Sequence, residues 1–318
     1  QGVNRFMLHV WQQQYDERLP GPPGAGTAMN RHNTWWEPGQ AWRDYLRRCQ
    51  LLLQAGRPVA DIAYFTGENL PRRAVVRPKF GSVYVADPEP PESYAFDSVN
   101  RDALLRLARA ERGRMSFPGG ASYKILILPK EAVLSPEVAR KIRALVQDGL
   151  VLCGPKPRHS PSLSGGAKAD EEVRAISDQL WGAGDGTRVA RNVGSGRVYS
   201  GMPLAEVLIE SGVQPDLEVR DLVDVATGRA PPPPSTPTAI RTAIGADRQG
   251  GGVQWIHRRL PEGDLYFISS QEPLEVSFDL SLRGAGRTAE VWNPVTAVVE
   301  EAAQWHVRDG RTHLPMRL

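Results

Sequence analysis

The sequence predicts a chain of the α/β plus β class with three consecutive parts. These are the terminal βα unit of a TIM-type barrel, an open parallel α/β domain and a C-terminal antiparallel β-sandwich. Three observations predict this order: an apolar segment followed by a long loop and an amphipathic helix, then alternating strand and helix patterns, then short strand patterns separated by turns. The corresponding domain boundaries are 1–56, 57–215 and 216–318.

The composition is that of a folded globular protein. The 318 residues are 41% hydrophobic and 24% charged, which excludes wholesale disorder. The 39 basic and 36 acidic residues give a net charge of +3, too even a balance to indicate a nucleic-acid partner. Two cysteines, Cys49 and Cys153, exclude a disulfide-rich scaffold and an all-thiolate zinc site. No apolar run approaches the roughly 20 residues that cross a bilayer, so no membrane span is expected.

The first part is predicted to be one βα unit. In the segment 5–11, apolar side chains fall on both faces of an extended strand, as is typical inside a parallel sheet or barrel. Because such a strand needs neighbours, we expect the chain to be a fragment of a longer barrel protein. Residues 12–37 are expected to form a long loop, and a helix is expected over Gln40–Gln54, with Gly56 as its stop signal.

The middle part alternates strand and helix patterns. Strands are expected over 59–65, 93–99, 123–128 and 150–153, and helices over 101–112, 136–147, 173–181 and 203–211. Ser135 with Pro136 is a typical helix start, because Ser favours the N-cap and Pro the first helical position. This alternation predicts an open parallel sheet with helices on both faces.

The last part is predicted to be all β. The segments 231–237, rich in Pro, and 250–252, made of Gly, indicate exposed connections. Beyond the first of them, short strand patterns separated by turns predict an antiparallel sandwich, with strands over 255–258, 265–269, 274–280, 289–292 and 312–316.

The candidate site lies on the catalytic face of the predicted barrel. His9 sits near the carboxyl end of the opening strand, the end that faces a barrel active site. The loop then carries polar groups and two adjacent indole rings that could stack on a sugar: Asn30, Arg31, His32, Trp35 and Trp36. The alternatives are a buried histidine bonded to a backbone carbonyl and Trp rings that anchor the loop, and we expect one ring to be structural.

The sequence offers no clear catalytic pair. Glycoside hydrolysis normally needs two carboxylates flanking the scissile bond. The presumed catalytic face carries only Asp16, Glu17 and Glu37, so we expect the essential pair to lie upstream of this chain. Cys153 follows a strand, as the nucleophile of an amidotransferase does, but the glycines of a Gly-x-Cys-x-Gly elbow are missing, which disfavours that class.

The chain resembles the C-terminal portion of glycoside hydrolase family 106, whose known activity is α-L-rhamnosidase. The resemblance rests on segments along most of the chain, and the first 68 residues are the most specific: Leu8-His9-Val10, Gln13-Gln14, Leu19-Pro20-Gly21, Asn30 to Trp36, Trp42 to Arg48, Leu53 to Gly56, Val59 to Glu68 and Ile256 to Arg259.

The resemblance implies a barrel active site, an α/β domain similar to that of β-galactosidase-like enzymes, and β-sandwich modules. It also implies an inverting mechanism with two glutamates and an active-site calcium, whose ligands are not identifiable in this chain. The sequence itself does not specify a location, and the resemblance implies a secreted or periplasmic one.

We therefore expect the C-terminal part of a glycoside hydrolase that cleaves terminal rhamnose, with a carbohydrate as its partner. His9, Asn30, Arg31, His32, Trp35 and Trp36 would form the sugar-binding rim. The alternative from another class is a non-catalytic carbohydrate-binding or scaffold fragment.

Overall fold

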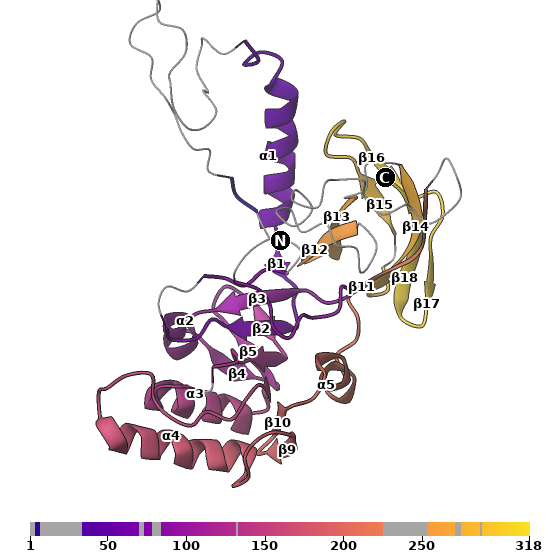
Figure 1. The fold of residues 1–318 in the computed structure, drawn as a ribbon. Coiled ribbons are helices and arrows are strands. Elements are labelled where there is room, and N and C mark those ends of the chain that lie inside the picture. Colours follow the sequence, from indigo (N-terminus) through magenta and orange to yellow (C-terminus); the bar gives the residue numbers. More distant parts are fainter. Residues whose placement is uncertain are drawn as a thin grey trace, which may run out of the picture.

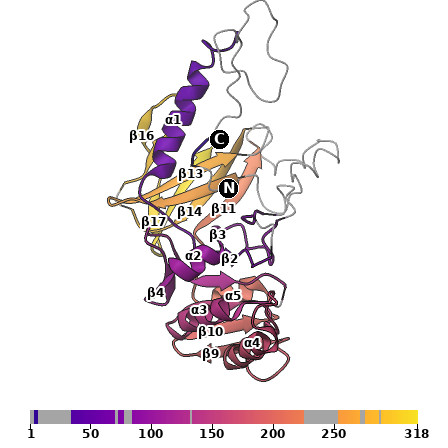
Figure 2. The ribbon, with the colours of Figure 1, turned by 90° about the vertical axis from the view of Figure 1, so that its left-hand side faces the viewer.

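The computed structural model describes residues 4–6, 34–69, 73–77, 84–131, 133–224, 253–270, 275–286 and 288–318. A helix, α1, projects from the rest of the molecule, above an α/β part and a group of antiparallel strands (Figures 1 and 2). The predicted opening strand lies almost wholly outside the described residues, and its described portion, residues 4–6, is not in a strand. The barrel unit therefore stays a prediction.

Helix α1 spans Gln40–Gln54, the range that the sequence predicts. Its lower end is buried through Cys49 and Leu53, whereas Trp42 is 41% exposed. Gly56 ends the helix with a positive φ of 58°, and a Cβ there would lie 2.2 Å from the carbonyl oxygen of Arg259. Only glycine therefore allows the chain to turn so close to the neighbouring strand.

A six-stranded sheet forms the centre of the α/β part, in the order β3-β2-β7-β8-β10-β9. Its members are β2 (Ile62–Phe65), β3 (Phe96–Val99), β7 (Ile125–Ile127), β8 (Val151–Cys153), β9 (Val189–Val193) and β10 (Gly196–Ser200). All neighbouring pairs are parallel except β10 with β9. The expected open parallel sheet is thus present, with one antiparallel strand at its edge.

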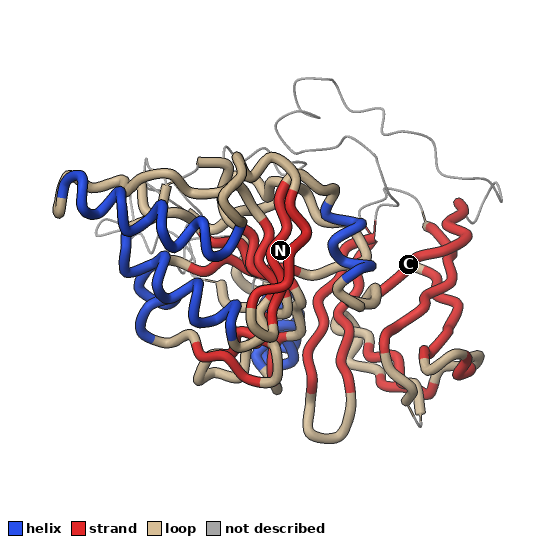
Figure 3. Tube along the Cα trace, turned by 90° about the horizontal axis from the view of Figure 1, so that it is seen from below, coloured by secondary structure: helices blue, strands red, loops and turns tan. Residues whose placement is uncertain are grey.

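Helices cover both faces of this sheet. One face packs against α2 (Arg101–Arg106), α3 (Pro136–Gln147) and α4 (Gly166–Trp181) in a cluster that includes Leu104, Ile142 and Leu180. The other face packs against α5 (Leu204–Glu210) through Val207 and Leu208. Seen from below, the α/β part lies on the left and the C-terminal antiparallel strands lie on the right (Figure 3).

Three predictions for the α/β part were wrong in detail. The helix expected over 101–112 ends at Arg106, because a hairpin of β4 (Arg109–Glu111) and β5 (Arg114–Ser116) follows, with Gly113 at φ 73° in its turn. Strand β6 (Ser122–Tyr123) pairs with β5 and includes Tyr123, the first residue of the strand expected over 123–128. Helix α4 begins at Gly166, well before 173. Its first turns are largely polar and carry no apolar period, so the sequence pattern does not reveal them.

The antiparallel part contains three sheets. One joins β1 (Arg57–Pro58), β12 (Val253–Arg259) and β13 (Asp264–Ser270), and a second joins β11 (Leu217–Asp224), β14 (Val276–Arg283), β18 (Arg311–Arg317) and β17 (His306–Arg308). The third is the pair β15 (Glu290–Trp292) and β16 (Val299–Glu301). The first two share one hydrophobic cluster, with Val253 from one sheet and Phe278 and Leu280 from the other.

The bounds of the strand expected over 59–65 are wrong, because two separate strands, β1 and β2, lie in this region. Arg57 and Pro58 pair with β12 across the predicted boundary at 56, and only Ile62–Phe65 enters the parallel sheet. The mixed α/β and β architecture is confirmed. The three domain boundaries and the sandwich stay predictions.

Candidate functional site

The turn that leads into α1 carries Trp35 and Trp36, the two tryptophans of the predicted sugar-binding rim. Trp35 is half-buried, and its carbonyl accepts a hydrogen bond from the Gly39 N–H at 2.7 Å. Its ring meets that of Trp42 edge-to-face, with centroids 6.2 Å apart. Trp35 therefore contributes to the packing that fixes the turn before the helix.

Trp36 is more exposed than Trp35, with 37% of its surface accessible. The guanidinium carbon of Arg43 lies 4.1 Å from the centroid of its ring, and the same guanidinium donates to the Trp36 carbonyl at 2.8 Å. Arg43 also donates to the side chain of Gln40 at 2.9 Å. These contacts hold an accessible indole in one place, which lowers the entropy cost of stacking a ligand on it.

The opposite end of α1 is joined to β12. The buried Arg258 guanidinium donates to the last carbonyls of the helix at 2.8, 3.3 and 2.9 Å, those of Ala55, Gln54 and Gly56. Burial lowers the pKa of Arg258, and a cation at a helix carboxyl end opposes the partial negative charge there. The helix that follows the turn of Trp35 and Trp36 is thus fixed at its carboxyl end by a residue of the antiparallel part.

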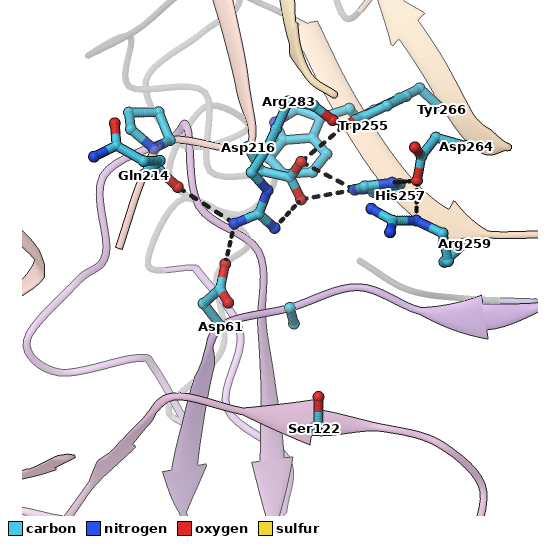
Figure 4. Close-up of polar contacts among 12 residues, drawn as sticks. Asp61, Ser122, Gln214, Asp216, Trp255, His257, Arg259, Asp264, Tyr266 and Arg283 are labelled. Carbon is cyan, nitrogen blue, oxygen red and sulfur yellow. Dashed lines mark hydrogen bonds and ion pairs between the residues drawn. The ribbon is translucent and has the colours of Figure 1, made fainter. Parts of the chain in front are cut away.

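A buried polar network joins the α/β part to the antiparallel strands. We call the cluster of Asp61, Asp216, His257, Asp264, Tyr266 and Arg283 the junction. His257 lies between two carboxylates: Nδ1 is 2.9 Å from Asp216 and Nε2 is 2.8 Å from Asp264 (Figure 4). The Tyr266 ring stacks on the imidazole with centroids 4.1 Å apart.

Asp216 connects this histidine to the parallel sheet. It accepts from the Tyr266 hydroxyl at 2.8 Å and pairs with Arg283 at 3.2 Å. Arg283 in turn donates to Asp61, just before β2, at 2.6 Å (Figure 4). Asp61 also accepts from Arg114 at 2.9 Å. One chain of charge-assisted hydrogen bonds therefore links elements of both parts.

The electrostatics of the junction favour a charged histidine. Burial by itself lowers the pKa of His257, but the hydrogen bonds to Asp216 and Asp264 raise it overall. Asp264 has a lowered pKa, because the bonds from His257 and Arg259 outweigh its burial. The side chains of His257 and Asp216 are 0% and 2% exposed. Since both ring nitrogens are engaged and water is excluded, the junction is suited to joining two parts rather than to acid–base catalysis.

The edge where parallel sheets usually bind ligands is filled by the chain itself. Glu68 follows β2, and its carboxylate accepts from the Ser135 N–H at 2.6 Å and the Ser135 hydroxyl at 2.7 Å, at the start of α3. Arg101 donates to it at 3.0 Å, and the Glu68 side chain is only 5% exposed. A built-in carboxylate thus occupies the place that an anionic ligand takes in doubly wound folds.

Two other chemistries find no support in the described structure. Burial raises the pKa of the Cys153 thiol to about 11, so it is not a thiolate nucleophile near neutral pH. Across the ranges that the structure describes, no three His, Cys, Asp or Glu side chains are grouped to hold a metal ion. The calcium expected from the resemblance therefore stays a prediction. In the same ranges, no helix is long and apolar enough to cross a membrane.

The structure places only part of the predicted rim. Trp35 and Trp36 lie together at the start of α1, whereas His9, Asn30, Arg31 and His32 lie outside the described residues. Glu37 is exposed in the turn before α1, and its carbonyl accepts from the Gln40 N–H at 3.0 Å.

The sequence interpretation missed the junction. His257 and Arg258 stand in one of the segments that carry the family resemblance, which was the available signal. Their partners are far away in sequence: Asp216 lies 41 positions from His257, and Ala55 lies 203 positions from Arg258.

Comparisons with known proteins match most of the chain. A family model described as alpha-L-rhamnosidase, that of glycoside hydrolase family 106, matches residues 1–227 and 238–306. A protein from Formosa agariphila described as "Putative beta-glucuronidase" is 30% identical over 323 residues, which cover 100% of this chain and 23% of that protein. A solved rhamnosidase structure from Novosphingobium sp. PP1Y has a TM-score of 0.72 and 29% identity, over 92% of this chain and 24% of that one. The chain thus spans about a quarter of the length of either relative.

Proposed function

The chain belongs to glycoside hydrolase family 106, and we propose that it is the C-terminal part of a larger α-L-rhamnosidase that removes terminal rhamnose from glycans or glycosides. The family match, which runs through both the α/β and the antiparallel parts, carries this proposal. The likeness to a rhamnosidase structure supports it. A secreted or periplasmic location is part of the same proposal.

We place residues 1–56 in the proposal as the last βα unit of the catalytic barrel. The exposed apolar side chains of α1 support this: Trp42 is 41% exposed and Leu51 is 72% exposed, on a helix whose Cys49 and Leu53 are buried. In a barrel, neighbouring helices and strands would cover such side chains. The shared core of the first two antiparallel sheets supports a sandwich in the same way.

In the proposed mechanism this chain binds the sugar and does not supply the acid–base pair. Trp36, held by Arg43, would stack on the apolar face of the sugar ring. His9, Asn30, Arg31 and His32 would hydrogen-bond its hydroxyls, with Trp35 supporting the turn. The inverting pair of carboxylates, and the calcium expected from the resemblance, would come from the rest of the protein.

The choice of sugar can be tested on the full-length parent protein. Aryl α-L-rhamnoside and aryl β-D-glucuronide are offered separately, and release of the aryl group is followed by absorbance. The proposal predicts turnover of the rhamnoside with little turnover of the glucuronide. The Formosa agariphila relative favours β-glucuronidase as a second candidate, and preferential turnover of the glucuronide would establish that candidate instead.

The non-catalytic alternative makes a different prediction. If the protein only binds carbohydrate, calorimetric titration with rhamnose gives heat, but neither aryl glycoside is cleaved. That result would overturn the enzymatic proposal while keeping the sugar-binding rim.

A further inference from the structure

The turn between β15 and β16 presents apolar side chains on the surface. Val295 is 69% exposed and Val298 is 51% exposed. Turns that face water are usually built from Gly, Pro, Asn, Asp and Ser, whereas these two valines present branched apolar groups. Neighbouring exposed apolar side chains of this kind mark contact surfaces more often than free ones.

Local hydrogen bonds fix the shape of this turn. The Asn293 side-chain oxygen accepts from the N–H groups of Val295 at 2.9 Å and Thr296 at 3.2 Å. The Asn293 N–H donates to the Val298 carbonyl at 2.9 Å, and its carbonyl accepts from the Ala297 N–H at 2.8 Å. Because the turn is already ordered, covering its valines costs little conformational entropy.

The turn lies against α1. The Arg48 guanidinium donates to the carbonyl oxygens of Pro294 at 2.9 Å and Val295 at 3.0 Å, and β16 lies beside the helix in Figure 2. Leu51 is three positions after Arg48, so the two side chains are neighbours on the helix surface. We call Leu51, Val295 and Val298 the flank surface, because they lie along the side of α1 that Arg48 marks.

The rest of the parent protein is the occupant that fits this surface. The chain covers 23% of the Formosa agariphila relative and 24% of the rhamnosidase structure, so about three quarters of each lies outside the matched region. In the proposed barrel, α1 is the last helix of a closed ring, and each of its flanks faces a neighbouring helix. The flank surface lies on one of these flanks.

We propose that the outer helices of the barrel cover the flank surface, so that the β15–β16 turn braces the antiparallel part against the catalytic part. This inference rests on the proposed function, because it takes α1 as the last barrel helix. It adds a second contact between the two parts, besides the one that Arg258 makes at the carboxyl end of α1.

Thiol labelling of the full-length parent tests the proposal. Leu51→Cys and Val298→Cys place probes on the two halves of the flank surface. Leu163→Cys is the control, since Leu163 is 99% exposed just before α4 and lies outside that surface. The labelled peptides are identified by mass spectrometry, so that Cys49 and Cys153 do not contribute. We expect both probes to react at least about tenfold more slowly than the control in the native parent, and all three to react alike in urea.

The possible outcomes separate this inference from the catalytic proposal. The flank surface is refuted if either probe reacts as fast as Leu163→Cys. Slow labelling that becomes fast on dilution would assign the surface to a second copy of the protein, which also refutes it. Because labelling needs no substrate, cleavage of the aryl rhamnoside together with fast labelling would remove only the flank surface. Slow labelling without cleavage would support the flank surface and remove only the catalytic proposal.

Discussion

The junction and the start of α1 both contain residue types that are common in functional sites, but the side chains of the first are buried and Trp36 in the second is exposed. In the junction, His257 and Asp216 are almost fully buried and hydrogen-bonded to each other, and Asp216 also accepts from the Tyr266 hydroxyl. At the start of α1, Trp36 is held from one side by Arg43 and is 37% exposed. A closed network indicates a structural connection, whereas a fixed but accessible ring indicates a place for a ligand.

The largest expected effect tests the junction directly. Asp216→Asn keeps the shape but removes the charge that His257 and Arg283 face in a buried place. We expect the free energy of unfolding to fall by about 3–5 kcal/mol, measured by urea denaturation. Asp102→Asn is the control, because the Asp102–Arg106 pair is largely exposed and its loss should cost less than about 0.5 kcal/mol. Equal effects of the two variants would show that the junction contributes nothing special.

The connection between α1 and β12 should be nearly as sensitive. Gly56→Ala puts a Cβ within 2.2 Å of the Arg259 carbonyl oxygen at a φ of 58°, so we expect a loss of about 2–3 kcal/mol in the free energy of unfolding. Gly212→Ala is matched in backbone conformation, with φ at 66°, but has no atom within 4 Å of the new Cβ. Its cost should be only about 1 kcal/mol. A larger loss at Gly212 would contradict the close packing at Gly56.

The charge on His257 predicts a dependence on pH. Because its pKa in the folded protein is raised above the ordinary value of 6.5, its contribution to stability is complete below that pH. The contribution is then lost as the pH rises through the folded-state pKa. Urea unfolding between pH 6 and 9 should show a decline that is smaller in His257→Gln. An unchanged slope in that variant would mean that the folded protein holds the ring neutral.

The comparison also explains what could be predicted from sequence. Helix α1 was predicted to its last residue, because Trp42, Cys49 and Leu53 keep a helical period and Gly56 stops it. The start of α3 was predicted from Ser135 and Pro136, although the Ser135 hydroxyl bonds Glu68 instead of capping the helix. Local signals of this kind act within a few residues and are visible in the sequence.

The parts that escaped prediction depend on distant partners. The strand β1 exists only because Arg57 and Pro58 meet β12, about 200 positions later. The junction likewise requires Asp61, Asp216 and His257 to come from three separate segments. Nothing in the local pattern around a histidine specifies which carboxylates will face it after folding. The candidate rim was predicted from local composition, and the structure describes only its two tryptophans.

The most direct measurement of the central claim compares two exposed tryptophans in the full-length parent. Trp36 lies at the proposed sugar rim, whereas Trp292 is 50% exposed on β15, whose following turn contacts α1 at Arg48, beyond the turn that carries Trp36. We predict that Trp36→Ala lowers kcat/KM for an aryl α-L-rhamnoside about tenfold or more, with a Tm within a few degrees of the parent, while Trp292→Ala leaves kcat/KM unchanged. An unchanged kcat/KM in Trp36→Ala, or an equal loss in both variants, would contradict a sugar-binding role for the start of α1.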